Sequence, residues 1–297
     1  KAFEQAVAKY RRILDSPTDP AVEENTLYRL AVTYHNMGDY AASTKAFRQL
    51  LENFPETPHQ AQAHFRIGEH LLRDGKDALK AIEAYEAALA AEPPPDLAGR
   101  ALRGLALARY ERKDHDMAAE LFLQLMEKHP DVELNEKTYT WVGQRFFEQE
   151  KWGQAAQAFD ALLDALPDYP YPEEVRFKIA ECAERAGKQD EALELYQAVI
   201  DAAPTSSKAV EAKFHMAKIY EAQNEADKAF ALYEAAANAN SGDVAARARF
   251  RLGELYAARE EFGKAARSYM RVAILFLHKE LSPEALWRAG QSFEKAG

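Results

Sequence analysis

The fold is decided by a stretch that reads EEVRFKIAECAERAGKQDEALELYQAVIDAAP and covers residues 173–204. Its apolar residues recur at helical spacing from Val175 onward, which predicts a first helix that ends near Gly187. A second amphipathic segment follows and stops at Pro204, which cannot extend a helix because it lacks the amide donor. The stretch therefore predicts two helices joined by a tight turn, followed by a proline loop.

The same pattern returns along the whole chain. An aromatic residue recurs every 36 to 38 residues, a small residue stands four positions before it, and a proline follows eight positions later in five of the units. The aromatics are Tyr10, Phe47, Tyr85, Phe122, Phe159, Tyr196, Tyr233 and Tyr269. A fixed period of this length is typical of stacked helical units. Strand and hairpin signals are absent, so the predicted fold class is all-α.

Each predicted first helix also carries a small residue at an equivalent position. These residues are Ala31, Gly68, Ala106, Gly143, Ala180, Ala217, Gly253 and Gly290. A glycine within a helix costs about 1 kcal/mol relative to alanine. Because glycine recurs at this position, we expect a packing contact that compensates for this cost. We expect this residue and the alanine of the second helix to form a socket for the next aromatic.

These positions resemble the tetratricopeptide repeat, whose usual period of 34 residues is about three shorter. The long form, with an aromatic three positions before many of the small residues, resembles repeats of bacterial cell-envelope proteins, such as the outer-membrane assembly lipoprotein and the periplasmic coordinator of the Tol–Pal system. The resemblance implies a right-handed α-solenoid superhelix of stacked antiparallel helix pairs. It also favours the bacterial periplasm or cell envelope, although the sequence itself leaves the compartment unknown.

The repeat predicts one solenoid over residues 1–297. Residues 1–14 are expected to be the second helix of a cut repeat, residues 22–281 seven whole repeats, and residues 283–296 an unpaired terminal helix. Because the chain begins and stops within a repeat, we expect a fragment or a processed product.

Composition narrows the function classes. The net charge is −10, with acidic and basic residues interleaved, which argues against a nucleic-acid partner. No apolar run is long enough to span a bilayer, so no membrane insertion is expected of this chain. His64 and His70 are six positions apart and HExxH is absent, so neither a metal nor another cofactor is expected. No nucleophile or acid–base motif is present, and the chain is predicted not to be an enzyme.

The sequence favours a partner-binding groove over a metal or catalytic site. The resemblance implies that first helices line a concave surface, and helical phase selects the residues that face it. The candidate contacts are Arg100, Arg103, Tyr110, Lys137, Gln144, Phe147, Phe177, Glu181, Glu184, Phe214, Lys218, Glu221, Phe250, Glu254 and Trp287. The central cations suit an acidic or C-terminal peptide, and the glutamates beyond residue 180 suit a basic segment. Alternatively, the recurrent aromatics pack between adjacent first helices.

Three functions remain open at this point. The first is an interaction scaffold that holds an extended or helical segment of a protein partner in the groove. The second is a structural component that self-associates through open solenoid ends. The third is an accessory region of a larger protein whose active domain lies outside these residues.

Overall fold

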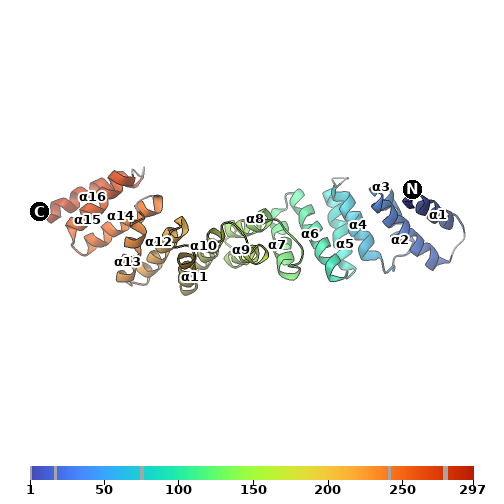
Figure 1. Cartoon of the computed structure of the whole chain (residues 1–297), viewed down its shortest axis with the longest axis horizontal. Helices are drawn as coiled ribbons and strands as arrows, with labels where there is room; N and C mark the ends of the chain where they lie inside the picture. Colours follow the sequence, from blue (N-terminus) through green and yellow to red (C-terminus); the bar gives the residue numbers. More distant parts are fainter. Residues whose placement is uncertain (1, 17–18, 74–76, 240–241, 277–279) are drawn as a thin grey trace. The chain divides into compact units, whose positions relative to one another are not determined.

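The computed structural model describes residues 2–16, 19–73, 77–239, 242–276 and 280–297. Within these ranges every regular element is helical: sixteen α-helices and one short π-helix, with no strand. The all-α prediction is confirmed. The chain divides into two compact units, residues 1–145 and residues 146–297, and each is described by itself (Figure 1).

Unit 1 contains seven complete helices and most of an eighth. They are α1 (Ala2–Leu14), α2 (Pro20–Asn36), α3 (Tyr40–Asn53), α4 (Gln60–Arg73), α5 (Ala78–Ala90), α6 (Pro95–Glu111), α7 (His115–Lys128) and α8 (Glu136–Glu148), of which the last reaches into unit 2. Each helix from α1 to α6 packs against the next one along the chain, and α4 also packs against α6.

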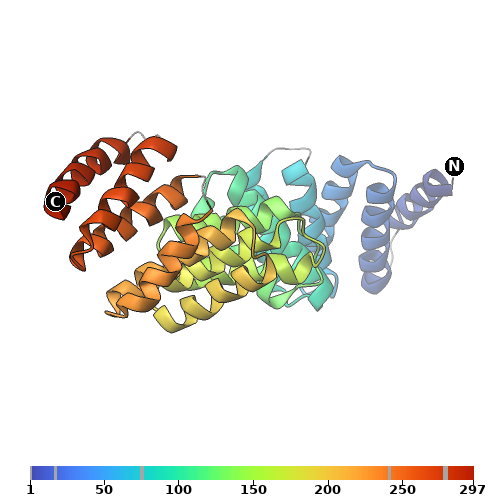
Figure 2. The ribbon, with the colours of Figure 1, turned by 60° about the vertical axis from the view of Figure 1, so that its left-hand side comes forward.

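Unit 2 repeats this arrangement. Its helices are α9 (Trp152–Ala165), α10 (Pro172–Arg185), α11 (Gln189–Ala202), α12 (Ser207–Ala222), α13 (Ala226–Ala237), α14 (Asp243–Ala258), α15 (Phe262–Arg271), the π-helix η1 (Val272–Phe276) and α16 (Leu281–Ala296). Figure 2 shows α10 to α16 (yellow to red) lying side by side. The even-numbered helices are the first helices of the repeats, and α10, α12, α14 and α16 also contact one another in sequence.

Prolines end the second helices at equivalent places. In α3, α7, α9 and α11 the residue after the last helical one has φ between −145° and −128° and ψ between 59° and 74°. These residues are Phe54, His129, Leu166 and Ala203. Each precedes a proline, and a following proline disfavours the helical conformation. The prediction that proline closes these helices is confirmed.

The turn from first to second helix requires one left-handed residue. Glycine supplies it at Gly38 and Gly187, with φ of 80° and 76°. Lys113, Glu150, Asn224 and Glu260 adopt nearly the same φ, between 58° and 64°, at the equivalent turns. The turn geometry is therefore kept even where the sequence lacks a glycine.

The recurrent aromatics fill the core. Phe47, Tyr196 and Tyr233 are fully buried. The Tyr85 ring lies so close to α4 and α6 that a Cβ on Gly68 would stand 2.9 Å from Cε1 and a Cβ on Gly104 2.4 Å from Cζ. The predicted close approach of the recurrent small residue to the aromatic is confirmed for Gly68. Gly104, which lets the α6 backbone approach the same ring, was not predicted, because it stands two positions before Ala106.

The C-terminal helix α16 packs against α15 and contacts α14. Its buried residues are Ala285, Ala289 and Ser292, whereas Leu286, Trp287 and Phe293 are exposed. The predicted division into one cut repeat, seven whole repeats and an unpaired terminal helix stays a prediction.

Candidate partner-binding face of the first helices

The candidate contacts all lie on the even-numbered helices. Within each unit, we call the side of these helices on which the candidates stand the first-helix face. Arg100, Arg103 and Tyr110 lie on α6, and Lys137 and Gln144 lie on α8, all within unit 1. Phe147 and the candidates beyond it belong to unit 2. Each group is examined within its own unit.

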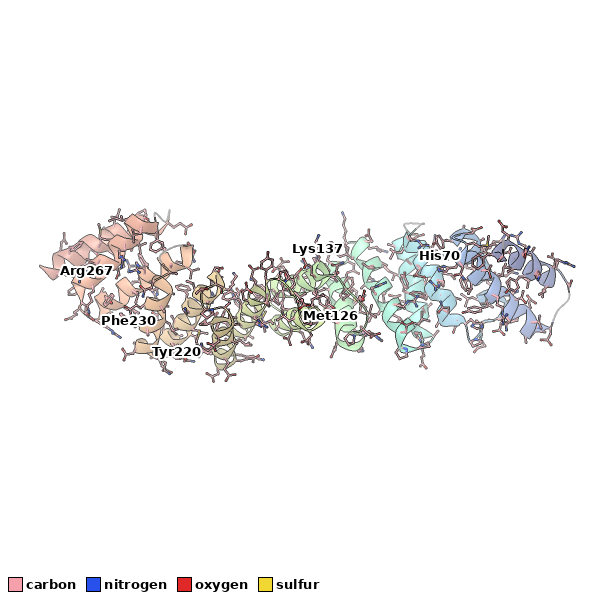
Figure 3. The ribbon with its side chains drawn as sticks, in the orientation of Figure 1. His70, Met126, Lys137, Tyr220, Phe230 and Arg267 are labelled. Atoms are coloured by element: carbon pink, nitrogen blue, oxygen red, sulfur yellow. The ribbon has the colours of Figure 1, made fainter. Side chains whose placement is uncertain are left out.

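In unit 1 the cations differ in how firmly they are held. The Arg100 guanidinium lies 4.8 Å from the centre of the Phe65 ring and 3.5 Å from an Asp96 oxygen. Arg103 is exposed and donates only a long hydrogen bond of 3.5 Å to the Glu133 carbonyl. Lys137 is exposed on α8, where Figure 3 labels it. Arg103 and Lys137 are therefore the cations best placed to meet an anionic partner.

Tyr110 gives this patch an aromatic element. It is 41% exposed, and its ring meets the half-buried Trp141 edge-on, with centroids 5.0 Å apart. Leu107, one turn before it on α6, is 43% exposed, and Gln144 is exposed on α8. Tyr110 and Leu107 thus offer apolar contact beside Arg103, and Trp141 supports them although the candidate set did not include it.

In unit 2 most of the recurrent aromatics serve the core. Phe177 and Phe250 are buried and pack against Tyr196 and Tyr269 of their own repeats, with ring centroids 5.4 Å and 5.3 Å apart. Phe177 also meets His215 of the next first helix, with centroids 5.5 Å apart, as the packing alternative predicts, whereas the ring partner of Phe250 lies on the second helix of its own repeat. Phe214 is half-buried against Tyr233.

Phe147 and Trp287, the first and last aromatic candidates of unit 2, are less buried than Phe177 and Phe250. Phe147 is half-buried and packs edge-on against Trp152, with the ammonium of Lys178 4.8 Å from its ring centre. Trp287 is 60% exposed on α16. Trp287 is thus the most accessible of the aromatic candidates in unit 2.

A half-buried carboxylate, Glu184, lies at the centre of a group of polar contacts in unit 2. Glu184 accepts a hydrogen bond of 2.7 Å from the Tyr196 hydroxyl, and its same oxygen lies 2.6 Å from Nδ1 of His215. Lys218 lies 3.6 Å from its other oxygen. Burial opposes ionisation of Glu184, but the hydrogen bonds from His215 and Tyr196 outweigh it and lower its pKa to about 2.

The same arrangement recurs one repeat later. The Tyr233 hydroxyl donates to Glu221 at 2.8 Å, and Arg251 from the next first helix binds the other Glu221 oxygen at 2.5 Å. Arg251 also pairs with Glu254, which in turn accepts from Arg288 at 2.6 Å. Carboxylates and cations therefore alternate from α10 to α16, and we call this series the carboxylate network.

The glutamates beyond residue 180, which the sequence suggested as an acidic surface, are paired with cations in the carboxylate network. Glu181 pairs with Lys178 at 2.8 Å, and Glu184, Glu221 and Glu254 each have a cationic partner on the following first helix. Of the cations that contact these glutamates, Lys218 belongs to the candidate set, whereas Lys178, His215, Arg251 and Arg288 do not. They share a signal that could have found them, since each basic residue stands two positions before the small residue of its helix: Lys178, His215, Arg251 and Arg288.

A pocket of about 510 Å³ opens on the first-helix face beside this network. Its lining residues are Phe214, Lys218, Glu221, Ala222, Tyr233, Arg247 and Arg251. The Lys218 and Arg247 side chains are 49% and 53% exposed. Glu221 is bound by Arg251, and the rim cations have partners as well, Arg247 with Asp243 at 2.7 Å and Lys218 with Glu184 at 3.6 Å. The pocket therefore suits an acidic or polar side chain that shares these half-exposed cations with their partners.

The described ranges contain no visible metal centre. Among those residues no group of three or more His, Cys, Asp or Glu can hold a metal ion. Cys182 is buried, and burial raises the pKa of its thiol to about 12. No helix in the same ranges combines the length and the apolar character needed to cross a membrane.

Comparisons with known proteins agree with this architecture. One sequence profile of the tetratricopeptide repeat matches residues 76–133 and 143–207, and a second matches residues 25–57. A tetratricopeptide repeat protein from Parabacteroides merdae is 18% identical, with 90% of this chain and 98% of that chain covered and a TM-score of 0.41. The TPR2AB-domain:pHSP90 complex of yeast Sti1 is 19% identical, with 91% and 92% covered and a TM-score of 0.39.

The C-terminal part of a TPR repeat-containing protein from Cytophaga hutchinsonii is 15% identical, with 96% of this chain and 95% of that chain covered and a TM-score of 0.39. No curated protein matches the chain. The profile matches together cover just over half of the sequence. The chain belongs to the tetratricopeptide repeat family.

Proposed function

We propose that this protein is a non-enzymatic scaffold that binds an extended or helical segment of a protein partner along its first-helix face. Tetratricopeptide repeats commonly act as protein interaction scaffolds. The observation that carries the proposal lies within unit 2, where the half-exposed cations Lys218 and Arg247 and the Phe214 ring line an open pocket of about 510 Å³. Such mixed lining is typical of sites that recognise peptides by a few polar groups.

The charges favour a partner segment with acidic residues in each unit. In unit 1, Arg103 and Lys137 are exposed beside Tyr110. In unit 2, the Lys218 and Arg247 side chains are about half exposed at the pocket, where Lys218 lies 3.6 Å from Glu184, Arg247 pairs with Asp243 at 2.7 Å, and Glu221 is bound by Arg251. We therefore replace the basic segment expected for the glutamate-rich stretch with a segment that carries carboxylates next to apolar side chains. A guanidinium can bind a carboxylate through two parallel hydrogen bonds.

Charge reversal tests this assignment in unit 1. The protein is isolated with its partners from the organism that encodes it, once as wild type and once as Arg103→Glu/Lys137→Glu, and the captured proteins are quantified by mass spectrometry. Lys128→Glu, an exposed charge reversal at the end of the second helix α7, is the matched control. We expect specific partners to be depleted at least tenfold in the double variant and retained in the control. An unchanged set of partners in both variants would remove the proposal for this unit.

A cell-envelope setting is part of the proposal. It is supported by the repeat length and by the recurrent first-helix aromatics that the sequence shares with envelope-type repeats. Fractionation of cells that produce the tagged protein from its own gene tests this setting. Recovery with the periplasmic or membrane fraction is expected, and recovery with the cytoplasm would contradict it.

Self-association is a second candidate, favoured by exposed apolar side chains near the end of the chain. Leu286, Trp287 and Phe293 on α16 are each more than 50% exposed, as are Ile274 and Leu275. Scattered apolar residues are ordinary at a surface, but a group of this kind is typical of a contact face. Light scattering over a concentration series should then show growth that Trp287→Glu abolishes. A monomer at all concentrations would exclude this role.

A further inference from the structure

Unit 2 contains a second pocket that lies apart from the residues of the first-helix face. Its volume is about 650 Å³. It is formed by α13, α14 and α15 together with Phe293 of α16, and its lining residues are Glu234, Asn238, Arg249, Leu252, Tyr256, Lys264, Arg267, Ser268, Met270, Arg271 and Phe293. We call it the C-terminal pocket.

A buried arginine lines the C-terminal pocket. Arg249 is only 6% exposed, and one of its terminal nitrogens donates a hydrogen bond of 2.7 Å to the Ala237 carbonyl. Its Nε atom is buried and has no hydrogen-bond partner among the described residues. No ion pair of Arg249 occurs in the same part of the structure. Burial and the neighbouring Arg271 lower the pKa of Arg249, and the opposing effect of Glu234 does not outweigh them. A buried cation that lacks an ion pair is costly.

The rim of the pocket adds further positive charge. Arg267 and Arg271 are exposed on α15 (Figure 3 labels Arg267), and neither forms a hydrogen bond or an ion pair with the rest of the described chain. Lys264 pairs with Glu261, and Glu234 is the one acidic lining residue among those described. This excess of cations occurs in a chain whose net charge is −10.

An equivalent pocket in unit 1 shows that the charge is not a property of the repeat. It has a volume of about 300 Å³ and is lined by His64, which stands four positions before the small residue of its helix just as Arg249 does. Its charged lining residues are two cations and two carboxylates, Arg48, Lys80, Glu52 and Glu83. At the same repeat position Leu27, Leu102 and Tyr139 are buried, whereas Arg176 is exposed and Lys213 is half-buried, so a buried arginine stands there only in the C-terminal pocket among the described repeats. The arginine cluster is thus specific to the C-terminal pocket.

We propose that the C-terminal pocket binds a carboxylate of an acidic peptide segment, with Arg249 at its base and Arg267 and Arg271 at its rim. Leu252, Met270 and Phe293 line the same pocket and accept an apolar side chain next to that carboxylate. Guanidinium groups bind carboxylates with charge-assisted hydrogen bonds, which are strong where water is excluded. The proposal extends the interaction role to a second surface, and it stands or falls without the first-helix face.

Isothermal titration calorimetry with defined probes tests the proposal on the full chain. The first probe is an acetylated and amidated peptide Glu-Glu-Leu-Phe-Glu-Glu, the second replaces each Glu by Gln, and the third is inorganic phosphate. We expect the glutamate peptide to bind and the glutamine peptide to bind at least tenfold more weakly. Binding of phosphate with an affinity equal to or higher than that of the glutamate peptide would overturn the proposal, as would binding of neither.

Variants then locate the site. Arg267→Gln/Arg271→Gln changes only exposed side chains and should raise the Kd of the glutamate peptide at least tenfold, since each lost charged hydrogen bond weakens binding by about that factor. Arg249→Met should do the same, with circular dichroism used to verify its fold. Arg185→Gln, an exposed arginine on α10 that lines neither this pocket nor the one on the first-helix face, is the matched control and should leave the Kd unchanged. A Kd that is the same in wild type and in the double variant would overturn the proposal.

Discussion

Two glycines at the same repeat position should respond in opposite ways to alanine. A Cβ added to Gly253 would stand 2.5 Å from Cε1 and 2.8 Å from Cζ of Tyr269, a ring that is only 2% exposed. A Cβ added to Gly290 would meet nothing within 4 Å. Alanine gains about 1 kcal/mol of helix propensity at either position. At Gly253 alone, overpacking of the filled core lowers the free energy of unfolding by about 1–3 kcal/mol.

The difference between the two variants therefore isolates the packing effect, because the propensity gain is common to both. We expect Gly253→Ala to be less stable than Gly290→Ala by about 1–3 kcal/mol. Thermal unfolding followed by circular dichroism measures this as a lower Tm for Gly253→Ala, by about 2–4 °C per kcal/mol for a chain of this order of size. Equal stabilisation of the protein by the two alanines would refute the socket.

Three further predictions concern single side chains. Burial lowers the pKa of His64, so its contribution to stability is complete above the unfolded pKa near 6.5 and is lost as the pH falls below that value. The urea midpoint of unit 1 should therefore be lower at pH 5.5 than at pH 7.5, and the difference should be smaller in His64→Leu. Equal midpoints of the wild type at the two pH values would contradict this prediction. Lys113→Gly should stabilise by about 1 kcal/mol because Lys113 has φ of 64°, and a loss of stability in urea unfolding would count against the turn strain. Since burial raises the pKa of Cys182 to about 12, iodoacetamide at pH 8 should alkylate the folded protein far more slowly than the urea-unfolded one; equal rates would show that the thiol is accessible.

The fold could be predicted because each repeat restates the same local rules. Proline closes the second helices, the small residue admits the aromatic, and the apolar spacing sets the buried side of each helix. Eight repetitions of the aromatic made these signals far stronger than any one of them alone. The helix content and the close approach of Gly68 to the Tyr85 ring followed from this periodicity.

The candidate site was harder to predict because exposure depends on neighbours that helical phase does not specify. Phe177 and Phe250 occupy positions that helical phase assigned to the groove, yet the second helix of their own repeat covers them. The glutamates looked like a free acidic surface, whereas Arg251 and Arg288 from the following helices bind them. Arg249 gave no sequence signal, since its burial results from the packing of α13 to α15 around it.

Site-specific photo-crosslinking tests the central claim, which is that partners bind along the first helices. A benzoylphenylalanine is placed at Leu107 or Lys218 on the first helices, and in separate variants at Asp160 or Glu194, which are exposed on the second helices α9 and α11. The account predicts that irradiation in the native organism yields partner adducts from the first-helix positions and none from the other two. Adducts that form equally from both pairs, or only from the second helices, would contradict it.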